Sequence, residues 1–182
     1  MTLWISVAVA AALVLAIVAI YNRLVALARR CDQSSADIDV QLKQRHDLIP
    51  SLVETVKGYA SHERGTLEEV MRARNAATAS PSAGAEAALG GALGRLMAVA
   101  EAYPDLKASQ NFTALQDELS DLENKIAAAR RFLNSATNEY NTTREQFPAN
   151  IVASMFDFES RETVVIAKDS RVTFDTAPSI RF

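Results

Sequence analysis

The chain has 182 residues, a net charge of −3 and a single cysteine, and it is 49% hydrophobic and 23% charged. These values exclude a disordered, collagen-like or disulfide-built protein, and they give no indication of a nucleic-acid partner. Aromatic residues make up only 7% of the chain, while Ala, Leu, Glu and Arg are abundant, which favours helices over strands. We therefore expect an all-α protein.

The first element is an uncharged apolar run from Leu3 to Ile20. As a helix it would measure about 27 Å, close to the hydrocarbon thickness of a bilayer, so we predict a transmembrane anchor over residues 1–22. Trp4 and Tyr21 stand near its two ends, where amphipathic rings suit the headgroup layer. A cleaved signal peptide is the alternative, but the run lacks a basic start and exceeds the usual length.

Basic residues follow the apolar run and do not precede it. The arginines are Arg23, Arg29 and Arg30. The positive-inside rule then predicts an N-terminus outside and a body in the cytosol, as expected for a single-pass membrane protein. Cations at this position also attract the lipid bilayer itself, whereas a nucleic-acid surface would need a longer basic stripe.

A seven-residue apolar period continues from Tyr21 to Tyr59, with Arg45 as its charged exception. The period keeps its phase across Pro50, which predicts one long helix leaving the bilayer. Pro50 would remove the hydrogen bond to the carbonyl of His46, so a kink or a break there is the alternative.

Two shorter helices are predicted next. Thr66 and Glu69 have the spacing of a capping box and predict a helix start, and the turn-rich stretch 78–84 predicts its end. A weaker helical pattern runs from Leu89 to Tyr103, before Pro104. It contains Gly90, Gly91 and Gly94, so we expect it to be the least stable helix.

The strongest heptad pattern runs from Phe112 to Phe147 and includes Leu122 and Ile126. It predicts the fourth helix of an antiparallel four-helix bundle over residues 23–150. In an up-and-down bundle this helix ends near the membrane, which would bring Phe147 back toward Tyr21.

Residues 151–182 are predicted to form an extended C-terminal tail with apolar anchors. Uncharged residues 147–156 are followed by short β-prone pieces. Phe156, Phe174 and Phe182 are its candidate contacts. Packing on the chain's own bundle and packing on a neighbouring chain or partner both remain open.

The search for chemistry gives little. His46 and His62 lack metal-site spacing and are read as partly solvated helix residues, so no cofactor or metal is expected. Cys31 lies on the apolar stripe, where a small core residue is favoured over a nucleophile or lipid acceptor. Arg45 and Asp47 are candidate seam contacts. An ion-pair layer with a partner from the fourth helix is favoured there over a ligand site.

Several long motifs resemble the LemA family of bacterial membrane proteins. They are residues 37–63, the segment Asn111–Leu119, the motif Phe147–Asn150 and the ending Ala177–Phe182. The resemblance implies an N-terminal transmembrane helix that carries an antiparallel helical bundle, and it hints at membrane quality control. Cys31, Ser34 and Ser35 depart from the bulkier residues expected there, which affects local packing.

These patterns together predict a non-catalytic, membrane-anchored scaffold or adaptor that forms homo-oligomers. All strong signals concern anchoring and helix packing, and none supplies a nucleophile, a base or a metal cage. The alternative is a regulatory subunit that conveys a membrane or envelope-stress signal to a membrane protease or another enzyme.

Overall fold

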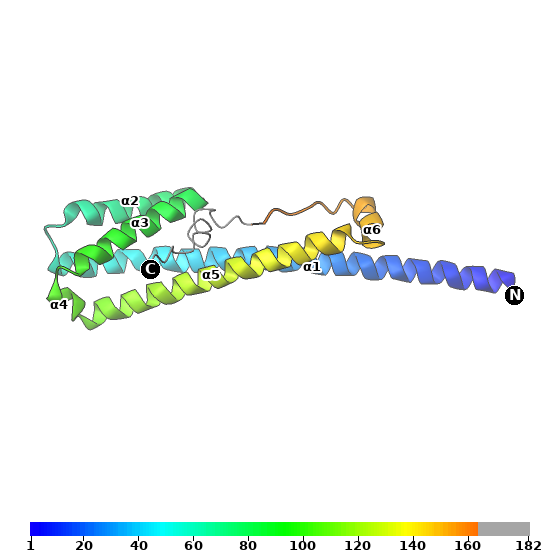
Figure 1. The fold of residues 1–182 in the computed structure, drawn as a ribbon, viewed down its shortest axis with the longest axis horizontal. Helices are drawn as coiled ribbons and strands as arrows, with labels where there is room; N and C mark the ends of the chain where they lie inside the picture. The colour runs from blue at the N-terminus through cyan, green and yellow to red at the C-terminus, as the bar shows by residue number, and fades with distance from the viewer. Residues whose placement is uncertain (164–182) are drawn as a thin grey trace, which may run out of the picture. The chain divides into compact units, whose positions relative to one another are not determined.

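The computed structural model describes residues 1–163, so the predicted contacts Phe174 and Phe182 lie outside the described residues. Across the described part the chain forms helices and no strand, which confirms the all-α expectation (Figure 1). The helices are α1 (Thr2–Tyr59), α2 (Arg64–Ala79), α3 (Ala83–Ala100), α4 (Pro104–Lys107), α5 (Gln110–Glu145) and α6 (Ala149–Met155). The chain divides into two compact units: Met1–Ser35 with Arg130–Phe182, here unit 1, and Ala36–Ala129, here unit 2.

Helix α1 is one continuous helix that contains Pro50, so the break considered above does not occur. Pro50 has no N–H, which leaves the carbonyl of His46 without its helical donor. The Arg74 side chain of α2 replaces that donor, because its Nε donates to the His46 carbonyl at 3.0 Å. A tertiary hydrogen bond therefore satisfies the carbonyl that Pro50 leaves free.

Unit 2 is built around one apolar core to which α1, α2, α3, α4 and α5 all contribute. Its completely buried side chains include Ile49, Leu52, Val56, Val70, Leu89, Leu96 and Leu106. Each such side chain contributes about 1.5–3 kcal/mol relative to an exposed position. Leu122 and Ile126, predicted on the apolar seam of the fourth helix, are also buried. The heptad pattern identified these buried positions correctly, but its last predicted member, Phe147, lies beyond the end of α5 at Glu145 and is 80% exposed.

The predicted capping box at Thr66 is wrong. The N-cap of α2 is Glu63, three residues before Thr66, and it makes no side-chain capping bond. The Glu69 carboxylate, which would have completed the box, instead accepts two hydrogen bonds from Arg95 of α3, at 2.5 and 3.1 Å. The Glu69 side chain therefore binds α3 and does not cap α2.

Helix α3 begins earlier than its apolar pattern and also ends earlier. Ser82 caps its N-terminus by accepting from the Ala85 N–H at 3.1 Å. The helix ends at Ala100, so Tyr103, expected as its last apolar position, instead precedes α4. Pro104 opens that short helix, in line with the preference of proline for the first helical turn.

Unit 1 contains the N-terminal part of α1, the C-terminal part of α5, and α6. Val152 and Ala153 of α6 pack on Leu24 of α1, and Ile20 and Phe158 border this small core. Residues 151–155 were predicted to be extended, but they belong to α6. The predicted domain boundaries at residues 22 and 150 fall inside α1 and α6. The division into an anchor, a bundle and a tail stays a prediction.

Candidate functional site

The first functional feature is the uncovered apolar surface of α1. Residues 1–19 are all exposed, and this part of the helix is long and apolar enough to cross a membrane. Monomeric soluble proteins rarely expose a continuous apolar surface of this extent, because water solvates it poorly. Trp4 and Tyr21, the predicted interface residues, are exposed near its two ends.

The predicted basic residues Arg23, Arg29 and Arg30 are all exposed. Two of them have acidic neighbours within unit 1. Arg29 lies 4.0 Å from Asp32, and Arg30 forms a 3.0 Å ion pair with Glu139 of α5. The Arg30 guanidinium also lies over the Phe132 ring, 5.0 Å from its centre. These contacts order the side chains that were expected to face the lipid headgroups.

Tyr21, a predicted membrane-anchor residue, meets Phe156, a predicted contact residue, in unit 1. Their ring centres are 4.8 Å apart in an edge-to-face arrangement, and Phe158 joins them at 5.6 Å from Tyr21. Edge-to-face pairing is a favoured geometry for aromatic rings. The chain after α5 thus reaches the residue that follows the apolar run of α1, although through Phe156 and not through Phe147, which was the residue predicted there.

Residues 158–161, which no periodicity singled out, are held by hydrogen bonds from α5. Tyr140 donates to the Glu159 carbonyl at 2.8 Å, and Arg144 donates to the Phe158 carbonyl at 2.6 Å. The Arg161 side chain reaches Asp32 of α1 at 2.5 Å, and this acidic partner raises the pKa of Arg161. The sequence missed this segment because its bonds use backbone carbonyls, which every residue carries.

A buried polar cluster formed by Arg45, His46 and Glu86 lies inside unit 2. The three residues are 7%, 6% and 7% exposed, respectively. The Glu86 carboxylate forms an ion pair with the Arg45 guanidinium, and its other oxygen lies 2.9 Å from His46 Nε2. The prediction that His46 is partly solvated is therefore wrong, since α3 covers it.

The principal partner of Arg45 comes from α3, not from the fourth helix as expected. Glu123 of α5 is only a peripheral neighbour, 3.9 Å from Arg45 and half-exposed. Glu86 lies in the first turn of α3, where the helix dipole also favours a negative charge. Sequence reasoning missed Glu86 because the weak pattern in residues 83–100 gave no register for pairing it with α1.

Asp47, the second predicted seam residue, lies at the edge of this cluster. It accepts a 2.6 Å hydrogen bond from Lys43, and this bond lowers the pKa of Asp47 below its usual value. Arg74 of α2 lies 3.8 Å from the same carboxylate. The arrangement joins α1, α2 and α3 through charges that are largely engaged with one another, which is the geometry of an ion-pair layer that sets helix register.

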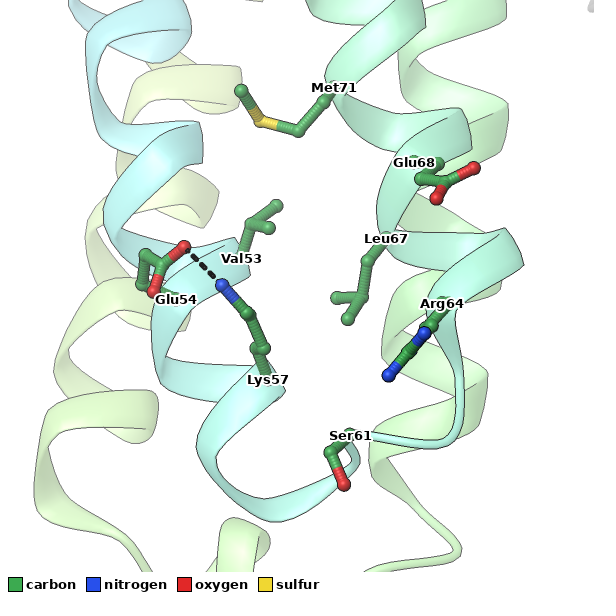
Figure 2. Close-up of a pocket in the computed structure, with 8 residues that line it drawn as sticks. All are labelled: Val53, Glu54, Lys57, Ser61, Arg64, Leu67, Glu68 and Met71. Carbon is green, nitrogen blue, oxygen red and sulfur yellow. Dashed lines mark hydrogen bonds and ion pairs between the residues drawn. The ribbon is translucent and has the colours of Figure 1, made fainter.

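An open cleft of about 430 Å³ lies between the end of α1 and the start of α2 (Figure 2). Val53 and Leu67 face each other across it, and Met71 closes one end. On its rim Lys57 pairs with Glu54 at 3.2 Å, while the Arg64 guanidinium points inward. The cleft thus has an apolar floor and a charged edge.

Helices alone over residues 1–163, together with an exposed apolar N-terminal helix, define the class of membrane-anchored helical proteins. The LemA family model matches residues 34–182, and the chain belongs to the LemA family. It is 25% identical to Protein LemA of Metamycoplasma hominis over 162 residues, which cover 86% of this chain and 74% of that protein.

A second set of relatives matches only part of the chain. It is 35% identical over 79 residues to Magnetosome protein MamQ 1 of Paramagnetospirillum magneticum, and 33% identical over 79 residues to Magnetosome protein MamQ of Magnetospirillum gryphiswaldense. Each match covers 43% of this chain and 29% of the magnetosome protein. The matched segment is thus less than a third of those relatives' length.

Proposed function

We propose that this protein is a non-catalytic scaffold or adaptor, anchored by α1 at the cytoplasmic face of a bacterial inner membrane. One observation carries the proposal. A single helix, α1, supplies both the exposed apolar run and the buried residues Ile49, Leu52 and Val56 of unit 2. Helix α1 would thus connect the folded body to the membrane anchor without a flexible linker.

The body would be an antiparallel four-helix bundle made by α1, α2, α3 and α5. The shared core of unit 2 supports this architecture, because all four helices contribute buried apolar residues to it. Bundles of this kind present long exposed helix faces, which are suited to binding other proteins or further copies of the chain. We include homo-oligomerisation in the proposal.

Two further observations support a structural role. The carboxylate of Glu86 is closed off from solvent between Arg45 and His46, so the most polar part of the interior acts in packing. In addition, a 79-residue segment similar to part of this chain occurs in larger proteins with a different name, as expected for an adaptor module.

The orientation is tested with C-terminal fusions in a bacterial host. Because Arg23, Arg29 and Arg30 follow the apolar run, an alkaline phosphatase fusion should be inactive and a green fluorescent protein fusion should fluoresce. As controls, both reporters are also fused to one membrane protein whose C-terminus is known to be cytoplasmic and to one whose C-terminus is known to be periplasmic. An active phosphatase fusion would contradict the cytoplasmic placement.

The scaffold role is tested by purifying the full chain from membranes and measuring its mass and composition. Large assemblies made mainly of this chain, or several non-enzymatic partners, would support a scaffold. Membranes from cells that express an untagged copy provide the control. Recovery of one stoichiometric enzyme whose activity depends on this chain would replace the proposal with a regulatory subunit.

A further inference from the structure

Unit 1 exposes a second apolar surface, separate from the apolar run of α1. We name it the α6 surface and define it as Phe147, Ile151, Met155 and Phe156. Their exposed fractions are 80%, 52%, 65% and 49%, respectively. Residues 147–156 contain no charge, and the next residue, Asp157, ends the uncharged stretch. Helix α6 therefore carries apolar side chains on its exposed face as well as on its buried face.

The buried face of α6 fixes where this surface lies along α1. Val152 and Ala153 pack on Leu24, with Ile20 at the border of the same cluster. Ile20 is the last residue of the apolar run, and Leu24 follows one helical turn later. The α6 surface is thus held at the end of the membrane-spanning segment.

The aromatic contacts place the surface at the same level. Phe156 and Phe158 pack edge-to-face on Tyr21, the residue directly after the apolar run. Aromatic rings concentrate at the interface between hydrocarbon and headgroups, and arginines just beyond it attract lipid phosphate. Arg23 is exposed two residues after Tyr21 and supplies such a charge.

We propose that the α6 surface is a second membrane contact, which lies in the headgroup and upper acyl layer of the bilayer that α1 enters. Its occupant is lipid, because the uncharged α6 surface is held against Ile20 and Leu24, where the uncharged apolar run of α1 ends. A short, uncharged helix with exposed aliphatic and aromatic side chains has the composition of an interfacial element. Unit 1 then contacts the membrane at two points, which fixes its orientation on the bilayer surface.

This inference rests on the membrane anchoring in the proposed function, but not on the scaffold role. The single tryptophan of the chain, Trp4, lies within the anchor. Its fluorescence therefore tests membrane insertion of α1 separately from membrane contact by the α6 surface. The full-length protein is reconstituted into phosphatidylcholine and phosphatidylglycerol vesicles whose lipids are brominated near the top of the acyl chain. Quenching of Trp4 in the unmodified protein reports the anchor.

The α6 surface is tested with new single tryptophans in a Trp4→Phe background. Met155→Trp and Ile151→Trp place the probe on the surface, and both positions are exposed enough to accept the ring. Phe132→Trp is the matched control, since Phe132 is also a half-exposed aromatic position of unit 1 but lies beside Arg30, well past the apolar run. Circular dichroism checks that each variant keeps its helicity.

The expected result is about a twofold loss of emission at positions 151 and 155 in brominated vesicles, with little change at position 132. Quenching of Trp4 without quenching at positions 151 and 155 would overturn the inference and leave the anchor intact. Absence of quenching at all positions would overturn the anchor as well. Disulfide formation between copies of a Cys31→Ala, Met155→Cys variant, without lipid quenching at 155, would assign the surface to a second copy of the chain.

Discussion

At the residue scale, the continuity of α1 depends on one side chain from another helix. Pro50 cannot donate to the carbonyl of His46, and a buried carbonyl without a donor costs roughly 1–3 kcal/mol. Arg74 of α2 donates to that carbonyl at 3.0 Å. Arg74 therefore compensates for the donor that Pro50 lacks, although the two residues are distant in the sequence and lie on different helices.

This pairing predicts non-additive stability effects. Arg74→Met should lower the free energy of unfolding by about 1–2 kcal/mol, because the His46 carbonyl loses its donor. In a Pro50→Ala background the same substitution should cost less, since the N–H of the new alanine supplies the helical bond. Thermal unfolding of the four proteins of this cycle in detergent measures the coupling. Equal costs in both backgrounds would show that Arg74 stabilises the protein through its other partners, Asp47 and Asn75, and not through the His46 carbonyl.

The buried cluster gives a second residue-scale prediction. Glu86→Ala should destabilise the protein by about 3–5 kcal/mol, because it leaves the Arg45 guanidinium buried without its main counter-ion. Glu123→Ala removes the half-exposed neighbour of the same arginine and should cost only about 0.5 kcal/mol or less. Denaturant unfolding monitored by circular dichroism compares the two. Similar losses would mean that Glu86 is not the principal partner.

At the scale of the elements, α5 shows how a heptad pattern becomes a packed helix. Leu122 and Ile126 are buried, whereas Asp121 is exposed and pairs with Lys125 at 2.6 Å. The apolar positions thus face the interior and the charged positions face water, as the three-four spacing requires.

Replacing a seam residue of α5 by a charge should disrupt the fold. Leu122→Asp or Ile126→Asp buries an unpaired carboxylate, so we expect loss of cooperative thermal unfolding in the full-length protein. Asp121→Asn is the matched control on the same helix and should shift stability by only a few tenths of a kcal/mol. If the seam variants melt as cooperatively as the control, α5 does not pack as described.

At the scale of the whole molecule, the chain after α6 contributes to the fold of unit 1. Residues 158–161 connect to α5 through side chains of α5 that donate to their backbone carbonyls, and to α1 through the pair Arg161–Asp32. The predicted tail therefore does not begin as a free segment. Its first residues belong to the structure that holds α6 beside Leu24 of α1.

Two truncations isolate this contribution. A chain that ends after Phe156 should melt at a lower temperature than a chain that ends after Thr163, because only the longer one keeps the hydrogen bonds of Phe158, Glu159 and Arg161. Each neutral bond contributes about 0.5–1.5 kcal/mol, so the difference should be several degrees. Differential scanning calorimetry of the two proteins in the same detergent measures it. Identical melting would show that residues 157–163 add nothing to stability.

The sequence by itself determined the features that depend on neighbouring residues. The apolar run identified the candidate membrane helix, because bilayer thickness fixes the length of such a run. The heptads predicted α1 and α5 and most of their buried positions, because helical periodicity places every third or fourth residue on one face; the terminal members Tyr59 and Phe147 are exposed. The motifs in residues 37–63 and 111–119 identified the family for the same reason, since they are local and long.

Only the tertiary structure decided which distant residues meet. Glu86 became the counter-ion of Arg45, and Arg74 became the donor for the carbonyl that Pro50 leaves free, through contacts between different helices. Likewise Glu69, predicted to complete a cap at Thr66, pairs with Arg95 of α3. A local pattern gives the face and length of a helix, but not its rotation and axial shift against a neighbour. Those two quantities decide which polar groups pair, and side chains from the whole core fix them together.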